Sequence, residues 1–262
     1  MSLILFAFLV SLGINLLMFM PAFIYKTDKI TDISYAVTFA VVASAGYMRS
    51  TQTNLHRLVT FLVLFWSFRL GIFLFIRINK SGKDVRFDGM REKFFLFLRF
   101  WVLQGVTVFV VMLAPILVYA QQDVSISTLS IIGAVVFVLG LLIEAVADAQ
   151  KFEFNGNPKN KSKWIDTGVW RASRHPNYLG EMMVWIGMYT VVVSSLDGTA
   201  RIVALASPLY IVGLLLFVSG VPLLEKSADK KWGKDKAFIS YKSQVPSVIP
   251  NVLSIRRALK RV

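Results

Sequence analysis

The sequence contains no cysteine and only two histidines, His56 and His175, among its 262 residues. The lack of cysteine excludes disulfides, thiolate metal sites and a cysteine nucleophile. Two histidines are too few for a multi-histidine site, so we expect no metal. Charged residues make up only 17% of the chain, hydrophobic residues make up 56%, and the mean hydropathy is +0.62. A soluble globule of this size cannot hide that much apolar surface, so lipid is the expected solvent.

Long apolar runs are what the chain has in abundance, and each is long enough for a helix to cross a hydrocarbon core of about 30 Å. We therefore expect an all-α integral membrane protein with seven transmembrane helices in a single domain, residues 1–262. The expected spans are residues 2–24, 33–49, 57–76, 96–119, 127–147, 178–196 and 202–221. After the last span, we expect a helix from Ser227 to Tyr241 and then an extended stretch broken at Pro246 and Pro250.

Positive charge is distributed unevenly among the connectors. If the N-terminus is outside and the C-terminus is cytoplasmic, 24 of the 29 Lys and Arg residues fall on the cytoplasmic side, and only Arg49, Arg57 and Arg201 lie in outer connectors. The positive-inside rule favours this orientation. Because the basic residues lie between apolar spans and form no soluble module, the net charge of +14 indicates contact with membrane lipid rather than nucleic acid.

Acidic residues inside or beside apolar spans are costly and therefore suggest function. Glu144 and Asp148 lie one helical turn apart at the end of the fifth span, and Glu181 lies four residues into the sixth. These carboxylates have a second interpretation, since they could pair with Arg69, Arg99 or loop lysines to hold helices together.

The densest polar cluster surrounds the start of the sixth span. Pro176 suits the first turn of a helix, and Arg171, Arg174, His175 and Asn177 flank it. A helix N-terminus with arginines beside it is suited to an anion such as phosphate. The alternative is an anchor on lipid headgroups. The sequence has no GxGxxG or Walker motif, so a nucleotide would be held without a Rossmann or P-loop fold.

The segment Arg174-His175-Pro176-Asn177-Tyr178-Leu179-Gly180-Glu181 resembles the C-terminal signature of a superfamily of membrane enzymes. That superfamily includes the steroid 5-alpha-reductases, the sterol C14 and delta-7 reductases and the isoprenylcysteine carboxyl methyltransferases. Further matches resemble the steroid 5-alpha-reductases and their bacterial homologues. They are Asp84-Val85-Arg86-Phe87, Leu103-Gln104-Gly105, Asp148 to Lys151, Leu224-Glu225-Lys226, Trp232-Gly233, Tyr241 and Pro250.

The resemblance implies an NADPH-dependent reductase in a bacterial inner membrane. Residues 1–119 would hold a steroid-like or other enone lipid, and residues 127–262 would bind the cofactor. Matching cofactor-binding positions are Arg69, Asp148, Lys163 and Asn177, with Arg86 and Arg171 as ligands of the pyrophosphate or the 2'-phosphate. Lys151, Arg174, His175 and Tyr178 are expected to bind the cofactor with them.

The resemblance also implies a catalytic set. Trp185 matches a tryptophan of the family's steroid pocket, and Trp66 stands where the family has a ketone-polarising tyrosine, so both are expected to contact substrate. Asp32 stands in place of a glutamate. An indole N–H cannot deliver a proton, so a protonated Asp32 is the expected donor to the ketone, with Glu181 as a further catalytic residue. A plain N-terminal helix cap is the alternative role for Asp32.

Two other functions stay open on the sequence alone. An isoprenylcysteine-type methyltransferase would share the Arg-His-Pro-Asn-Tyr segment but would use S-adenosylmethionine. A non-enzymatic lipid-binding or transport protein is the third class, although neither inverted repeats nor matched broken helices are visible. The basic residues around the shared segment favour NADPH, and reduction of a 3-oxo-delta-4 steroid is the activity we expect.

Overall fold

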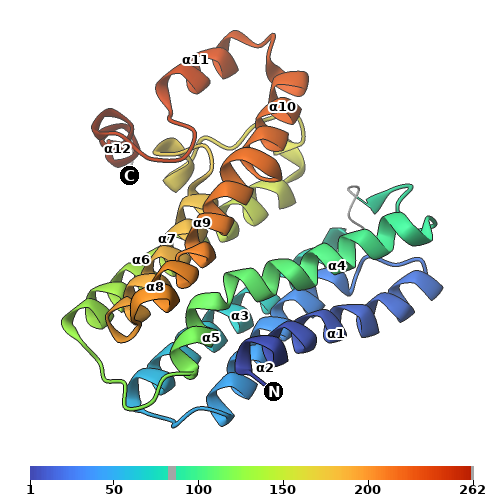
Figure 1. Cartoon of the computed structure of the whole chain (residues 1–262). Coiled ribbons are helices and arrows are strands. Elements are labelled where there is room, and N and C mark those ends of the chain that lie inside the picture. Colours follow the sequence, from blue (N-terminus) through green and yellow to red (C-terminus); the bar gives the residue numbers. More distant parts are fainter. Residues whose placement is uncertain (82–86, 261–262) are drawn as a thin grey trace. The chain divides into compact units, whose positions relative to one another are not determined.

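The computed structural model describes residues 1–81 and 87–260, and these residues form helices and no strands (Figure 1). The α-helices are α1 (Leu3–Ile24), α2 (Thr31–Met48), α3 (Asn54–Ser81), α4 (Phe94–Val111), α5 (Leu113–Tyr119), α6 (Thr128–Gly156), α7 (Pro176–Val192), α8 (Gly198–Ala204), α9 (Ala206–Gly213), α10 (Val221–Trp232), α11 (Lys236–Gln244) and α12 (Val252–Leu259). Three short 3-10 helices, η2 (Pro158–Asn160), η3 (Gly168–Arg171) and η4 (Val193–Ser195), and a π-helix, η5 (Leu214–Val218), complete the set.

Within the described residues, five helical segments are long and apolar enough to cross a membrane: Leu3–Ile24, Asn54–Lys80, Phe94–Val111, Thr128–Gly156 and Gly198–Trp232. The all-α fold and the multi-pass membrane character are therefore confirmed. Helix α2, with Thr, Ser and Asp among its residues, and helix α7, with 17 residues, fall outside this set. The total of seven spans and the orientation of the termini stay predictions.

Two of the expected spans are interrupted by proline. Pro115, Pro208 and Pro222 each lie four residues after the last residue of α4, α8 and η5. Proline has no N–H for the carbonyl four residues earlier and its ring clashes with that carbonyl, so the helix ends there. The carbonyl of Val111, released in this way by Pro115, accepts a hydrogen bond from the Ser207 hydroxyl. The carbonyl freed at the Pro115 break is therefore satisfied within the protein.

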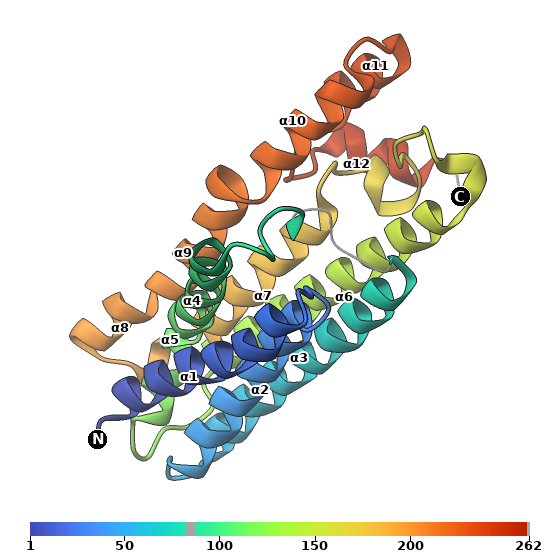
Figure 2. The same cartoon turned by 90° about the vertical axis from the view of Figure 1, so that its right-hand side faces the viewer.

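The chain divides into two compact units. Unit 1 is Met1–Ala134 with Met188–Ser207, and unit 2 is Val135–Gly187 with Pro208–Val262. In unit 1, α2 packs on α3, and α1 packs on α4 and α2 (Figure 2).

A buried polar network links three helices of unit 1. The Gln104 side-chain nitrogen on α4 donates to Asn15 Oδ1 on α1 at 2.8 Å and to Ser34 Oγ on α2 at 3.0 Å. Beside it, a Cβ on Gly105 would lie 3.2 Å from the backbone of Leu12, so α1 and α4 approach closely. Interhelical hydrogen bonds and small residues stabilise helix packing in lipid. Two residues of the Leu103-Gln104-Gly105 motif thus have a packing role.

Two glycines bring α6 and α7 of unit 2 together. A Cβ on Gly140 would lie 2.6 Å from the carbonyl oxygen of Gly180, and a Cβ on Gly180 would lie equally close to the carbonyl oxygen of Gly140. The indole N–H of Trp170, in η3, donates to the carbonyl oxygen of Ala147 on α6 at 3.0 Å. The connector after α6 is therefore fixed to the helix that precedes it.

The tail differs from the expected single helix followed by an extended stretch. Helices α10 and α11 are separated at Gly233, and the last described turns form α12. Helix α12 begins with a capping box, in which the Asn251 side chain accepts from the Ser254 N–H and the Ser254 hydroxyl bonds the Asn251 backbone. The expected non-helical stretch is present at residues 245–250, but the prediction lacked α12, because this local cap starts a helix directly after Pro250.

Candidate functional site

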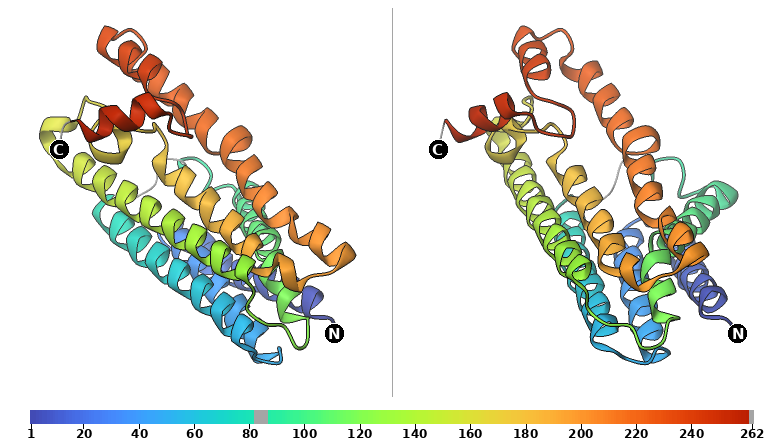
Figure 3. Two further views of the ribbon diagram at one scale, coloured as in Figure 1. Left: turned by 90° about the vertical axis from the view of Figure 1, so that its left-hand side faces the viewer. Right: turned by 60° about the vertical axis from the view of Figure 1, so that its left-hand side comes forward.

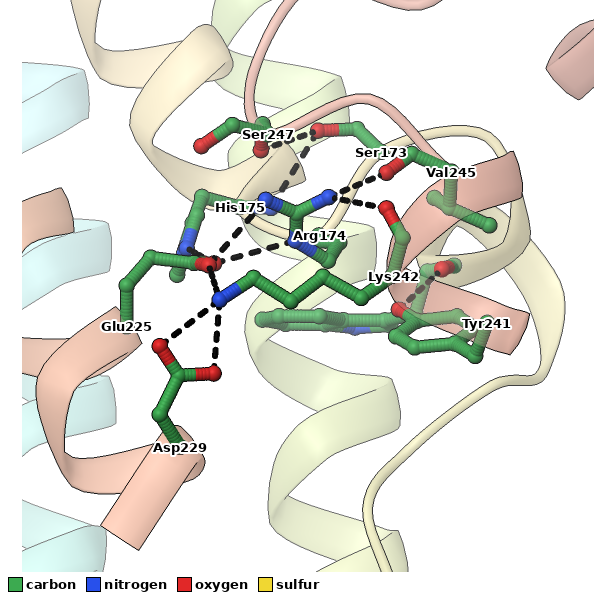
Figure 4. Close-up of polar contacts among 10 residues, drawn as sticks. Ser173, Arg174, His175, Glu225, Asp229, Tyr241, Lys242, Val245 and Ser247 are labelled. Carbon is green, nitrogen blue, oxygen red and sulfur yellow. Dashed lines mark hydrogen bonds and ion pairs between the residues drawn. The ribbon is translucent and has the colours of Figure 1, made fainter. Parts of the chain in front are cut away.

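Glu225 on α10 holds together the start of α7 and the end of α11 (Figure 4). Its carboxylate accepts two hydrogen bonds from Arg174, from Nε at 3.0 Å and from Nη2 at 3.1 Å. It also lies 2.8 Å from Nε2 of His175 and 3.2 Å from Nζ of Lys242. We refer to Arg174, His175, Glu225 and Lys242 as the Glu225 clamp.

Backbone contacts reinforce the clamp. Nη1 of Arg174 donates to the carbonyl oxygens of Lys242, at 2.9 Å, and Val245. The backbone N–H of Arg174 donates to Pro246 at 3.0 Å, and that of His175 donates to Ser247 at 2.9 Å. Every guanidinium nitrogen of Arg174 is therefore engaged within the protein. The expectation that Arg174 binds the cofactor has to accommodate this structural role.

His175 is 6% exposed and keeps one nitrogen unused. Because Nε2 faces a carboxylate, we assign the ring proton to Nε2. Nδ1 is then a lone-pair acceptor, and it is buried without a hydrogen-bond partner among the described residues. The Tyr178 ring stacks on the imidazole with centroids 5.7 Å apart and an interplanar angle of 14°. Buried acceptors without partners are uncommon, and they concentrate at functional sites.

Next to the clamp, unit 2 contains a cavity of about 240 Å³. Helices α6, α10 and α11, η3 and residues 163–165 line it, together with Arg174, His175 and Glu225. Its walls carry the rings of Trp164, Trp170, Trp232, Phe238 and Tyr241. Lys151 also lines it, with Nζ 4.8 Å from the Trp170 ring centroid, as does the exposed Lys163. The cavity thus combines flat aromatic surface with cations.

Ionisation near the cavity is controlled by its neighbours. Hydrogen bonds to Asp229 and Glu225 raise the pKa of Lys242 above its usual value, so it stays an ammonium. Burial raises the pKa of Tyr241, which stays a phenol and donates its O–H to the Trp170 carbonyl at 2.9 Å. Lys151, Lys163 and Arg174 contribute three cationic side chains to the lining and Glu225 contributes one carboxylate, so the lining carries a net positive charge.

The other expected cofactor-binding residues that the structure describes are not among those that line the cavity. Asp148 is buried on α6, and the side-chain oxygen of Asn177, on α7, is buried without a hydrogen-bond partner in the described part of the chain. Arg171 donates from Nε to the Asp166 carbonyl at 2.9 Å and does not line the cavity. Arg69 belongs to unit 1 and lies over the Phe73 ring at 5.6 Å.

Arg86, with Asp84 and Val85 of the same motif, lies outside the described residues. Phe87, the last residue of that motif, is buried in an aromatic cluster with Phe97 and Trp101.

Among the expected catalytic residues, Asp32 has an unexpected partner. Its carboxylate accepts a hydrogen bond from Nη2 of Arg77 on α3 at 2.7 Å. The pair joins α2 to α3, so the Asp32 side chain has a structural partner in addition to its expected catalytic role. No hydrogen bond from the Asp32 side chain caps α2, whose N-cap residue is Ile30.

Tryptophans 66 and 185 are both inside the protein. Trp66 is fully buried on α3 with its ring against Phe39 at 4.9 Å, and Trp185 is 1% exposed on α7. Glu181 is partly buried one turn before Trp185. Trp66 belongs to unit 1, whereas Trp185 and Glu181 belong to unit 2.

Unit 1 also has an apolar groove of about 370 Å³ between α2 and α3, lined by Ile33, Ala36, Val37, Ala40, Ser67, Phe68, Gly71, Ile72 and Phe75. Trp66 does not line it, because its ring points to Phe39 instead. The groove is the candidate site for a lipid-like ligand within this unit.

Sequence reasoning missed the roles of Glu225 and of the aromatic walls. Leu224-Glu225-Lys226 stood out only as a matching segment, with no function for the carboxylate. Its partners lie about fifty residues earlier in the chain, at Arg174 and His175, and no local spacing indicates that pairing.

No curated protein and no solved structure matches the chain significantly. Residues 18–245 match the family described as "Protein of unknown function (DUF1295)". That match covers most of the apolar helices, the Glu225 clamp and the cavity, and the chain belongs to the DUF1295 family.

Proposed function

We propose that this chain is an NADPH-dependent reductase of the carbon–carbon double bond of an enone lipid. The activity would be of the 3-oxo-5-alpha-steroid 4-dehydrogenase type, in a bacterial inner membrane. Membership of DUF1295, a family associated with steroid 5-alpha-reductase-like membrane proteins, supports the proposal. So does the resemblance of residues Arg174 to Glu181 to the reductase signature.

The positive aromatic cavity in unit 2 is the observation that carries the proposal. A phosphate-bearing nucleotide fits this donor set, since bases stack on aromatic rings and phosphates attract ammonium groups. Trp164, Trp232 and Phe238 would hold the base, and Lys151 and Lys163 would hold phosphate. Arg171 would assist from its place directly after Trp170, where its Nε donates to the Asp166 carbonyl. Arg174 would act indirectly, by keeping His175 and the tail in place.

S-adenosylmethionine fits the same lining less well. It carries no phosphate and has a positively charged sulfonium, which Lys151 and Lys163 would repel. This charge argument favours the reductase over the isoprenylcysteine-type methyltransferase.

When bound, NADPH supplies the hydride that adds to the β carbon of the enone. The chain has to hold the lipid, exclude water and stabilise the developing enolate oxygen. The groove between α2 and α3 would take the apolar body of the substrate. Ser67, near the middle of α3, contributes a hydroxyl group to the lining of the groove.

The test begins with the cofactor. Purified protein is denatured, and the released small molecules are identified by mass spectrometry. The proposal expects NADP(H), whereas S-adenosyl compounds would indicate the methyltransferase and replace the proposal.

The second step tests the substrate class. NADPH consumption is followed in nanodiscs with testosterone, progesterone, a 4-en-3-one sterol and a trans-2-enoyl thioester. The 5-alpha-reduced form of each steroid serves as a control that cannot react. Oxidation that depends on an enone, with a reduced product of matching stoichiometry, is expected. Failure of all four substrates, with NADP(H) bound, would exclude the proposed substrate class.

A further inference from the structure

The C-terminal helix α12 exposes a row of large apolar side chains in a part of the chain that carries many charges. Ile249, just before the helix, is 75% exposed, as is Leu253, and Val252 and Leu259 are 65% and 70% exposed. Such residues concentrated on eight residues of helix are not a normal water-facing surface. The opposite side, with the buried Ser254, packs toward the protein.

Basic residues lie on the same exposed side. Arg256 and Lys260 are exposed beside Leu253 and Leu259, whereas Arg257 turns inward and is only partly exposed. The described part of α12 carries no acidic residue. An apolar helix face with cations among its residues is typical of segments that lie in the interface of an anionic membrane.

The position of α12 within unit 2 is consistent with a helix that lies in a membrane interface. Helix α12 packs on η3, and η3 is fixed to the carbonyl of Ala147 on α6 through Trp170. Ala147 ends the apolar stretch of α6, and Asp148 and Lys151 follow it. Because α6 is one of the candidate membrane spans, α12 is expected to lie near the level at which the apolar part of that helix ends. It also runs across the direction of α6 rather than along it (Figure 3).

We propose that α12 is an interfacial helix that seats Ile249, Val252, Leu253 and Leu259 in an anionic bilayer surface, with Arg256 and Lys260 on lipid phosphates. The charge, the expected depth and the orientation of α12 favour an anionic bilayer surface as its partner. The proposal is independent of the enzymatic one, since it concerns a surface and no reaction.

The absence of cysteine makes the test direct. Leu253→Cys is labelled with an environment-sensitive fluorophore in the full-length protein, reconstituted in nanodiscs that carry nitroxide lipids. Lys234→Cys, at the exposed turn between α10 and α11, is the matched control. A helix buried about 5–10 Å into the headgroup boundary predicts strong quenching at Leu253 by a shallow nitroxide, less by a deep one, and little at Lys234.

A second comparison tests the charge. Arg256→Glu combined with Lys260→Glu, in the Leu253→Cys background, should lower the quenching in anionic nanodiscs several-fold. The Leu253→Cys protein that keeps Arg256 and Lys260 should show a similar loss of quenching when it is placed in neutral nanodiscs. Equal quenching at Leu253 and Lys234 would overturn the proposal. So would quenching at Leu253 that stays the same both in the Arg256→Glu, Lys260→Glu variant and in neutral nanodiscs. Protection of the Leu253 label from an aqueous quencher without quenching by lipid would place a protein on this face instead, and would also overturn it.

Discussion

Replacing Glu225 with glutamine tests whether the clamp organises the tail. The change keeps the size and one acceptor oxygen but removes the charge that faces Arg174, His175 and Lys242. The carboxylate is 19% exposed and the guanidinium 13% exposed, so both are largely desolvated.

The magnitude follows from this burial. Breaking a fully buried ion pair costs about 3–5 kcal/mol, because the remaining charge has no partner. Residual solvent around Glu225 and Lys242 screens part of the ion-pair interaction. We therefore expect Glu225→Gln to lower the free energy of opening the tail by about 2–3 kcal/mol. That equals a roughly 30- to 150-fold increase in opening of the tail.

Hydrogen–deuterium exchange measures this opening directly. Amides of α11, Val245 and Ser247 should exchange faster in Glu225→Gln by the factor given above, whereas amides in the middle of α3 should not change. Asp229→Asn is the control, since Asp229 lies one turn further along α10, contacts the same Lys242 at 2.6 Å and is 50% exposed. An exposed pair contributes about 1 kcal/mol or less. If the two variants opened the tail equally, the clamp would be an ordinary surface pair and the reasoning would be refuted.

Three further predictions concern the cofactor, the acid and the packing. Arg171→Ala should raise the KM for NADPH far more than Lys260→Ala in steady-state kinetics, because Arg171 directly follows Trp170 of the cavity wall, whereas Lys260 follows the last residue of α12; equal effects would leave both as membrane-facing charges. Asp32→Asn should leave turnover at saturating NADPH nearly unchanged but lower the melting temperature, as should Arg77→Gln, since the two form an ion pair. A loss of about a hundredfold or more in turnover for the Asp32 variant alone would instead assign it a role as acid. Gly140→Ala should destabilise the protein by about 1–3 kcal/mol in thermal unfolding, because the new Cβ would lie 2.6 Å from a carbonyl oxygen of α7; an unchanged midpoint would mean that the two helices separate without cost.

Much of the helical framework could be predicted from composition alone, for a physical reason. In lipid, a backbone must satisfy its own hydrogen bonds, so an apolar run of sufficient length becomes a helix whatever its neighbours are. The breaks near Val111 and Val218 were also within reach, since Pro115 and Pro222 require them. Helix α12 was missed although its cap, Asn251 with Ser254, is local.

The arrangement of the site depended on the tertiary structure. The sequence indicated that Arg174 and His175 begin a helix beside other basic residues, and anion binding was the natural reading. The fold brings Glu225 to both of them, which gives Arg174 a structural role that the sequence did not indicate. It also gathers rings from residues 164 to 241 into one cavity beside Lys151 and Lys163. Local chemistry determined which segments become helices, whereas contacts between distant segments decided which charged side chains lie together around the cavity.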